Sequence, residues 1–398
     1  MTVESISTTF ATGRRAGAMT FGAIFALESL VRSMNSTVIS LQAYDLLGSS
    51  QKVSELSTIV SLSVLVTTLM FPFALGRLRR RWAYTLGVTA MVVASLLLAS
   101  YTVMGQASGM YFRNCGAAIM NITLSLYIMD HIKRSELARS EPVRLSLSTF
   151  SWMIGPASGV WLYTHYGPWG PQLASIAAAL ALFLLFWYLR LSDRVTMPSG
   201  TLQPFNPLAN VLRFVRQPRL RLAWMIAFGR SCFWSTFFIY GPLLMVEGGV
   251  GKQISGLMIS ASQGLLLCAY LFGRLSHRFG VRPVIGMCFA VMAVSAIAAG
   301  LAGKAMPYVA MFFMLCAALA ATGLDGVGGI PFLRAVRPHE RQRMAPVYRT
   351  FIDFSELIPA VIFAVALSYF EIGSVFIILG MGLTVLGAVA FRYLPKSL

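Results

Sequence analysis

Runs of about 20 apolar residues recur along the whole chain, and this feature restricts its fold more strongly than any other. A helix needs about 20 apolar residues to cross a hydrocarbon core of about 30 Å. Hydrophobic residues make up 57% of the 398 residues and charged residues only 12%, whereas a soluble fold of this size needs roughly a quarter of its residues charged. We therefore predict an integral membrane protein, which excludes soluble enzymes and soluble nucleic-acid-binding proteins.

The apolar runs predict an all-α polytopic fold of twelve transmembrane helices. In chain order they cover residues 17–41, 53–76, 82–104, 107–130, 146–166, 170–190, 221–245, 254–273, 283–302, 306–332, 346–369 and 372–392. The connections are short except for 191–220, in which Pro and Gly recur as in a hinge. We expect a six-helix N-terminal half (1–190), a cytoplasmic linker (191–220) and a six-helix C-terminal half (221–398).

The basic residues predict the orientation, because cytoplasmic loops carry the excess of Lys and Arg. Of the 32 Lys and Arg, only Lys52, Lys252 and Lys304 fall in predicted outer loops, and four more (Arg32, Arg113, Arg230 and Arg349) lie in the interiors of spans. With both termini cytoplasmic, the net charge of +18 reflects topology rather than a surface for nucleic acid. The compact loops favour a bacterial inner (cytoplasmic) membrane.

Charged residues are also distributed unevenly among the spans. Apart from Arg190 and Arg392 at their last positions, the third, sixth, ninth and twelfth spans contain no ionisable Asp, Glu, Lys, Arg or His, whereas the first, fourth, seventh, tenth and eleventh have such residues in their interiors. Ionisable groups inside a membrane almost always face the bundle interior or a wet cavity. We expect every third helix to face lipid and the charged helices to line a cavity.

Two short patterns repeat at nearly constant separation. Arg32-Ser33 in the first span recurs as Arg230-Ser231 in the seventh, and Gly76-x-Leu78-x-x-Arg81 recurs as Gly273-x-Leu275-x-x-Arg278. A parallel duplication of six helices is typical of transporters whose substrate site lies between the halves near the bilayer midplane.

The motifs resemble those of the major facilitator superfamily of secondary transporters. The family's loop pattern GxLaDrxGrk is approached by residues 273–282, including Gly273, Arg278 and Gly280, and more loosely by residues 76–83. Arg113-Asn114-Cys115-Gly116 is similar to the family's RxxxG-type motif, and Gly155-Pro156-Ala157-Ser158-Gly159 is similar to the GPxxG core of its antiporter motif. His277 and Arg80 stand where the family usually has Asp, so the charge lock made by that Asp is not expected here.

The resemblance implies alternating access, in which the two halves rock about a central cavity and Gly76, Gly273, Arg278, Gly280, Gly155, Pro156 and Gly159 serve conformational motifs. It also implies a role in proton handling for Arg113. Gly155 and Gly159 in addition form a GxxxG step, which permits close approach between helices, and Pro156 adds a bend.

Residues at i, i+4 and i+7 share one face of a helix, and two spans place charges in this relation. Glu28, Arg32 and Asn35 do so in the first span, and Arg349, Asp353 and Glu356 in the eleventh. Each central charge costs about 2.5–3.5 kcal/mol on insertion scales, so the groups must pair or face water. A Glu28–Arg32 bridge that only fixes packing is the structural alternative, and Arg349 is close enough to the cytoplasmic end to reach the headgroups.

From these arguments we predict two sets of site residues. The substrate set is Arg32, Asn35, Arg230, Asn121, Gln263 and Trp234, and the proton-coupling set is Glu28, Arg113, Asp325, Asp353 and Glu356. Arg32 and Arg230 in one cavity would suit an anionic solute, unless each is neutralised by a nearby carboxylate. Asp325 lies among four glycines in residues 323–329, which predicts a hinge that carries a buried acid.

The sequence thus predicts a proton-coupled secondary transporter of a small organic solute, with efflux favoured by the Gly155-Pro156 element. The alternatives are uptake of a metabolite or vitamin-like anion, or a sensor or scaffold that keeps the fold without transport. Scattered Cys and His residues give no disulfide framework, metal site, cofactor or catalytic constellation. We therefore expect no enzymatic activity, and a monomer whose partners are the solute, protons and the lipid bilayer.

Overall fold

The computed structural model describes residues 18–75, 78–131, 134–189, 207–336, 344 and 347–395, and these residues form helices joined by short connections. Each of the twelve predicted spans coincides with one helix or with a series of consecutive helices. Within the described part of the chain, seven helical segments are long and apolar enough to cross a membrane, and they correspond to the third, sixth to tenth and twelfth predicted spans.

The first six predicted spans form the group of helices that we call the N-terminal half. Its members are α2 (Ala18–Met34), α3 (Val38–Leu47), α4 (Ser50–Leu75), α5 (Arg80–Ala99), α6 (Val103–His131), α7 (Arg134–Tyr166) and α8 (Trp169–Tyr188). A short helix, α9 (Pro207–Val215), falls within the predicted linker.

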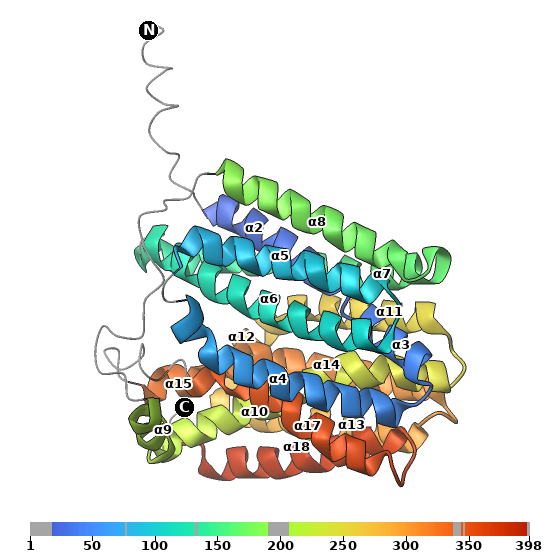
Figure 1. Ribbon diagram of the computed structural model, residues 1–398. Coiled ribbons are helices and arrows are strands. Elements are labelled where there is room, and N and C mark those ends of the chain that lie inside the picture. The colour runs from blue at the N-terminus through green and yellow to red at the C-terminus, as the bar shows by residue number, and fades with distance from the viewer. Residues whose placement is uncertain are drawn as a thin grey trace, which may run out of the picture.

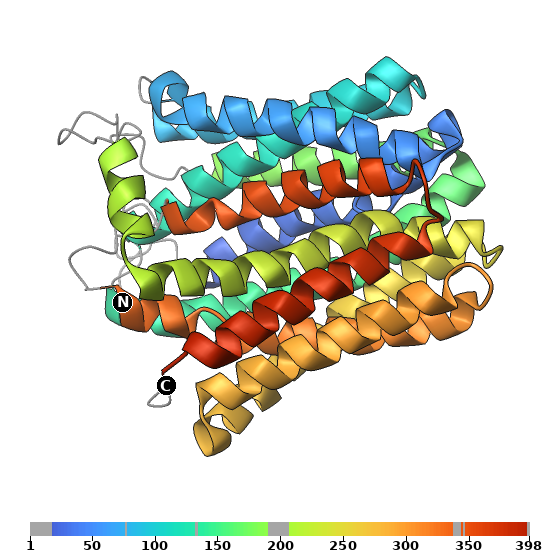
Figure 2. The same ribbon diagram turned by 90° about the horizontal axis from the view of Figure 1, so that it is seen from below.

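The remaining spans form the C-terminal half. Its helices are α10 (Pro218–Glu247), α11 (Lys252–Gly264), the 3-10 helix η1 (Leu265–Cys268), α12 (Ala269–Phe279), α13 (Val281–Ala302), α14 (Pro307–Val327), α15 (Ile330–Ala335), α17 (Phe351–Ala366) and α18 (Gly373–Tyr393). Figures 1 and 2 show the long helices of both halves running side by side, with α9 and α15 near one end of the bundle.

Several predicted spans are interrupted rather than continuous. The first breaks at residues 35–37 between α2 and α3, and Asn35, Ser36 and Thr37 are all weak helix formers. The eighth tightens into η1, and the tenth breaks at Gly328–Gly329, inside the glycine run that predicted a hinge. Irregular backbone at membrane depth is tolerated only where protein or a wet cavity surrounds it.

The GxxxG step of α7 brings that helix against α2. A Cβ atom at Gly155 would lie 2.0 Å from Ser33 Oγ, and one at Gly159 would lie 1.8 Å from the carbonyl oxygen of Met34. No side chain fits at either distance, so the predicted close approach is confirmed.

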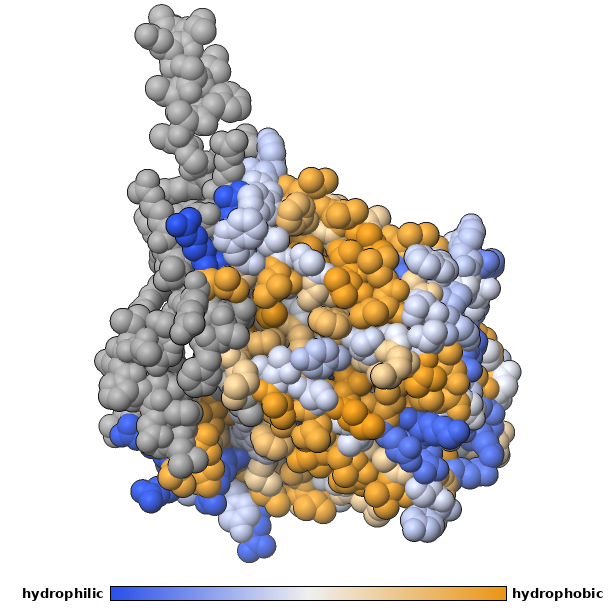
Figure 3. Space-filling view, in the orientation of Figure 1, coloured by the Kyte–Doolittle hydropathy of each residue, from blue (hydrophilic) through white to orange (hydrophobic). Residues whose placement is uncertain are grey.

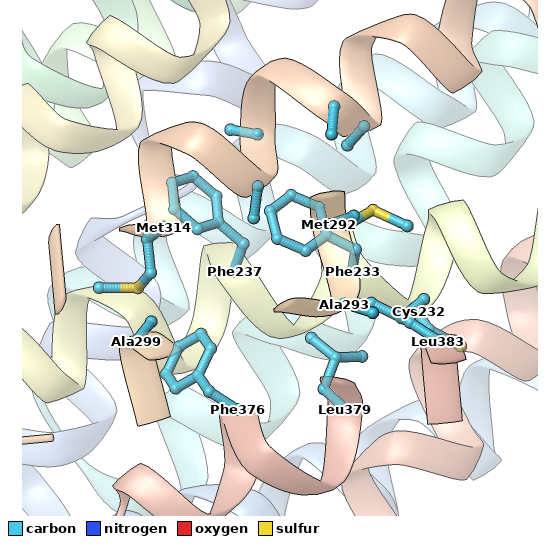
Figure 4. Packing of buried hydrophobic residues seen from close by; sticks show 14 of the residues in the cluster. Cys232, Phe233, Phe237, Met292, Ala293, Ala299, Met314, Phe376, Leu379 and Leu383 are labelled. Atoms are coloured by element: carbon cyan, nitrogen blue, oxygen red, sulfur yellow. The ribbon is translucent and has the colours of Figure 1, made fainter. Parts of the chain in front are cut away.

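The core of the C-terminal half is built from α10, α13, α14 and α18. Figure 4 shows Phe233 and Phe237 of α10 packed beside Met292 of α13, Met314 of α14 and Phe376 of α18. All five side chains are fully buried. Burying a side chain of this kind contributes roughly 1.5–3 kcal/mol, so this cluster fixes the four helices to one another.

The helices of the third, sixth, ninth and twelfth spans are α5, α8, α13 and α18. Each buries one side and exposes apolar side chains on the other. Trp82 of α5, Leu184 of α8, Val294 of α13 and Val385 of α18 are all exposed. Figure 3 shows hydrophobic residues covering the middle of one face, with hydrophilic residues gathered toward the ends. That these four helices face lipid stays a prediction, since α4, α14 and α17 also expose apolar side chains such as Val66, Phe312 and Val365.

The two halves meet along α4 with α17 and along α7 with α11. Four of the polar bonds between the halves lie toward one end: Asp45 with Lys252, Ser50 with Glu247, Ser54 with Tyr240 and Thr164 with Gln253. We call it the outer end, because Lys52, Lys252 and Lys304 were predicted to lie outside.

The duplicated Arg-Ser pairs occupy matching positions in the two halves. Ser33 Oγ donates to the carbonyl oxygen of Ser151 in α7 at 2.9 Å, and Ser355 Oγ of α17 donates to Ser231 Oγ at 2.8 Å. In each half the serine therefore joins the first helix to the fifth.

Candidate functional site

The break between α2 and α3 leaves carbonyl groups at the end of α2 without helical partners, and side chains of other helices bind them. Arg113 Nη2 of α6 donates to the carbonyl oxygen of Arg32 at 2.9 Å, and Ser175 Oγ of α8 donates to that of Val31 at 3.2 Å. A cation at this position also opposes the negative end of the helix dipole. Arg113 is thus a cap for α2 as well as a predicted coupling residue.

Glu28 is the most deeply buried charge of the site. Its side chain is 0% exposed, and Arg32 Nη1 lies 3.9 Å from its Oε1 atom, one helical turn away. The predicted Glu28–Arg32 pair is therefore present. Asn35 lies in the break directly after α2, where Gln172 Nε2 donates to its Oδ1 atom at 3.0 Å, so its side chain joins this break to α8 inside the N-terminal half.

Helix α17 and the turn before it bring the second charged set to the interface between the halves. Glu356 lies within electrostatic range of Arg113 and Arg32 of the N-terminal half, and also of Asp353. Arg349 is exposed, and its Nη2 atom donates to Asn121 Oδ1 of α6 at 3.2 Å. Charges that the sequence placed on separate helices thus meet across the two halves.

Arg230 does not join this group. Its Nη1 atom lies 2.7 Å from Asp325 Oδ1, and Trp234 Nε1 donates to Asp325 Oδ2 at 2.9 Å. Both carboxylate oxygens are therefore engaged within the C-terminal half, between α10 and α14. This is the predicted alternative in which a nearby carboxylate neutralises Arg230.

The other predicted residues lie apart from these clusters. Gln263 is buried at the end of α11, next to the 3-10 turn. Gly280 joins α12 to α13 with φ at 89°, a conformation that favours glycine. Gly273 has open space around it and Arg278 is exposed, while Gly76 lies outside the described residues.

Pro156 lies at the contact between α7 and α11. Its carbonyl oxygen is 3.2 Å from the place that a Cβ atom of Gly256 would take.

The sequence interpretation missed two features. It treated the first span as continuous to residue 41, although the helix breaks and then runs on to Leu47, and the Asn-Ser-Thr run was an available signal. It also assigned no role to Asp45, which binds both Tyr163 and Lys252. Asp45 is the only acidic residue near the end of the first span, and that isolation was its signal.

Chemically, the site holds carboxylates and guanidinium groups that can exchange partners across the interface between the halves. The described residues include no group of three or more His, Cys, Asp or Glu side chains that could hold a metal ion. A carboxylate that faces arginines of the other half can bind a proton, a cation or a solute group when those arginines move away. The arrangement thus suits binding that is linked to movement.

Comparison with known proteins gives the same fold. Residues 21–269 match the sequence profile of the Major Facilitator Superfamily, and no curated protein sequence matches the chain. A POT family transporter in complex with 5-aminolevulinic acid superposes with a TM-score of 0.75 at 12% identity, covering 96% of each chain.

Two further solved structures share the fold. The nucleoside transporter NupG has a TM-score of 0.71 at 13% identity, covering 94% of this chain and 98% of its own. A D-xylose-proton symporter has a TM-score of 0.72 at 12% identity, covering 95% and 98%. The profile covers more than half of the sequence and the structures nearly all of it, which confirms the resemblance carried by the motifs. The chain belongs to the major facilitator superfamily and has the fold of its multi-pass membrane transporters.

Proposed function

We propose that this protein is a secondary active transporter, which moves a small organic solute by alternating access and couples that movement to protons. The observation that carries the proposal is the place of Glu356, a carboxylate of the C-terminal half that lies within electrostatic range of Arg32 and Arg113 of the N-terminal half. The moving units are the halves 1–190 and 221–398, joined by the linker 191–220.

The coupling follows from the cost of burying charge. While the halves are together, two guanidinium groups of the other half stabilise the anionic form of Glu356 electrostatically. If rocking separates the halves, a charged Glu356 loses that compensation, and an uncompensated charge in a membrane interior is expensive. Taking up a proton removes the cost, so the movement of the halves becomes linked to protonation. Glu28, Asp353 and Asp325 are the further acids that could take part.

The bonds at the outer end support the alternating-access step. Asp45 with Lys252 and Thr164 with Gln253 join the halves there through exposed or half-buried polar side chains. Such contacts contribute little individually, so they can break and re-form in a transport cycle. We place both termini in the cytoplasm and the protein in a bacterial inner membrane as a monomer, on the argument from basic residues and compact loops.

For direction, we favour efflux, because the Gly155-Pro156-Ala157-Ser158-Gly159 element is similar to the core of the family's antiporter motif. It lies where α7 contacts α11 of the other half: the backbone N–H of Ala157 donates to Ser260 Oγ at 2.9 Å. An antiporter would use inward proton movement to drive the solute out.

Uptake of an anionic solute is the second candidate, and a different observation favours it. Arg32, Arg113 and Arg349 are close enough for mutual electrostatic effects. A site with several guanidinium groups matches the geometry of a carboxylate or phosphate. In this candidate, Arg113 and Arg349 would bind the anionic solute together with Arg32, a role that the sequence had suggested for Arg230.

The test is transport by the purified protein in liposomes, with a pH gradient imposed in either direction. Labelled 5-aminolevulinic acid, a dipeptide, a nucleoside, D-xylose and a hydrophobic organic cation form the first panel, chosen in part from the solutes of the structural neighbours. Concentration of one solute against its gradient, abolished when the pH gradient is collapsed, is the expected result. Saturable binding without transport of any of them would instead indicate a sensor or scaffold.

A further inference from the structure

The outer end of the N-terminal half holds a cavity of about 620 Å³ that the central charges do not reach. It is lined by Asp45, Ala99, Ser100, Tyr101, Tyr163, Thr164, Gly167, Pro168, Trp169 and Lys252. All of these residues belong to the N-terminal half except Lys252, which is the first residue of α11. One side chain of the opposite half thus enters a cavity built by the other.

Lys252 fills the place of an ammonium ligand in this cavity. Its Nζ atom lies 2.6 Å from Asp45 Oδ2 and 5.3 Å from the centre of the Tyr163 ring. The Tyr163 hydroxyl donates to the same carboxylate oxygen at 2.5 Å, which fixes the orientation of Asp45. A carboxylate together with the face of an aromatic ring is the chemistry that recognises organic ammonium groups.

The remaining walls fit the rest of such a ligand. Tyr101 and Trp169 are both lining residues and are 41% and 50% exposed, so they offer aromatic surface to a molecule in the cavity. Tyr101 has φ at 51°, and no other non-glycine residue in the described part of the chain has a positive φ. Backbone strain of this kind persists where surrounding structure imposes it and is frequent at ligand sites.

From this geometry we propose that Asp45, Tyr163, Tyr101 and Trp169 form a binding site for an organic ammonium group, and that Lys252 occupies it as a tethered competitor while the outer end is closed. The ammonium site rests on the proposed function in one respect, because the opening of the outer end during alternating access is what removes Lys252 from the cavity. An external ammonium compound and closure of the outer end then compete for one carboxylate.

The chain offers a matched control at the same end. Lys304 Nζ lies 2.7 Å from Glu371 Oε1, and both residues belong to the C-terminal half. The hydrogen bond to Glu371 and the charge of that residue raise the pKa of Lys304, so this pair stays ionic in the same buffers. Lys304→Met removes an outer ammonium group without emptying the cavity.

The experiment is isothermal titration calorimetry of the purified full-length protein with benzyltrimethylammonium, and with benzyl alcohol as the uncharged comparison. We expect Lys252→Met to bind the ammonium probe at least tenfold more tightly than the wild type, and Lys304→Met and Lys252→Arg to match the wild type. Adding Asp45→Asn to Lys252→Met should abolish the binding, and benzyl alcohol should not discriminate among the variants.

Equal binding by Lys252→Met and the wild type, or binding that survives Asp45→Asn, would overturn the proposal. Lys252→Gln serves as a second variant in case the methionine protein does not fold. The calorimetry needs no transport, so a protein that binds the probe as expected but moves no solute in liposomes refutes the proposed function alone. Transport without the Lys252-dependent binding refutes only the ammonium site.

Discussion

Arg113 binds the backbone of Arg32: its guanidinium donates to that residue's carbonyl oxygen at 2.9 Å, and so two cationic residues on different helices are held together. The bond forms because α2 ends two residues after Arg32 and leaves the carbonyl without a helical partner. Arg113 therefore stabilises an interrupted helix in addition to any role in coupling.

Replacing Arg113 with Met should destabilise the protein by about 2 kcal/mol, the usual range for a hydrogen bond from a charged group whose acceptor stays buried. Ser175→Ala removes a neutral bond to the neighbouring carbonyl and should cost about half as much. Thermal unfolding of the two variants in detergent would rank them. A Ser175 variant less stable than the Arg113 variant would contradict a capping role for the arginine.

Glu356→Gln should uncouple transport from protons. We expect accumulation driven by a pH gradient to fall at least tenfold, because the amide cannot take up a proton when the halves separate. Solute exchange at equal pH on both sides should continue, since it needs no net proton movement. Glu371→Gln, which alters an exposed acid at the outer end and outside the site, is the control and should leave accumulation unchanged. Loss of exchange together with accumulation would show that Glu356 serves the fold or the solute rather than coupling.

Gly256→Leu should prevent closure of the outer end. A Cβ atom at Gly256 would lie 2.9 Å from Val160 Cβ, across the contact between α11 and α7, so the larger side chain must push the halves apart. Hydrogen exchange measured by mass spectrometry should then increase in residues 155–160 and 252–260. Gly382→Ala is the control, because nothing lies within 4 Å of a Cβ atom there. Unchanged exchange at both segments would mean that the halves do not part at this contact.

The Arg230–Asp325 pair should show strong coupling in a double-mutant cycle. Arg230→Met leaves the carboxylate with only Trp234 as its partner, and should cost about 2 kcal/mol, below the 3–5 kcal/mol of a fully buried pair because both side chains are about a quarter exposed. Adding Asp325→Leu should restore most of the loss in thermal stability. Additive losses in the double variant would indicate that the two side chains contribute independently.

The fold was predictable because span length, charge placement and motif spacing are local properties of the sequence. Each of the twelve expected spans coincides with helical structure, and the Gly328–Gly329 break falls in the run that predicted a hinge. The partners of the charges were less predictable, because they depend on how helices distant in sequence are oriented. Glu28 and Arg32 are one turn apart and their pairing was expected, whereas the meeting of Glu356 with Arg113 requires the packing of two halves.

The interruption at residues 35–37 shows the same limit. Weak helix formers are often accommodated inside a long helix, since propensity is readily overridden by packing. The break becomes evident only when Arg113 and Ser175 are seen on the freed carbonyl groups. The roles of Asp45 and Lys252 were hidden for a related reason, because their 207-residue separation gave no local pattern.

The two Arg-Ser dipeptides hold equivalent places in the two halves, but their arginines have different partners. Both serines bind the fifth helix of their own half, so this joint is a symmetric element of the fold. Arg32 lies within electrostatic range of charges in the opposite half, whereas Arg230 is held by an acid and a tryptophan of its own half. A rocking movement of the halves would therefore change the surroundings of Arg32 and leave those of Arg230 as they are, so equivalent positions would respond unequally to one movement.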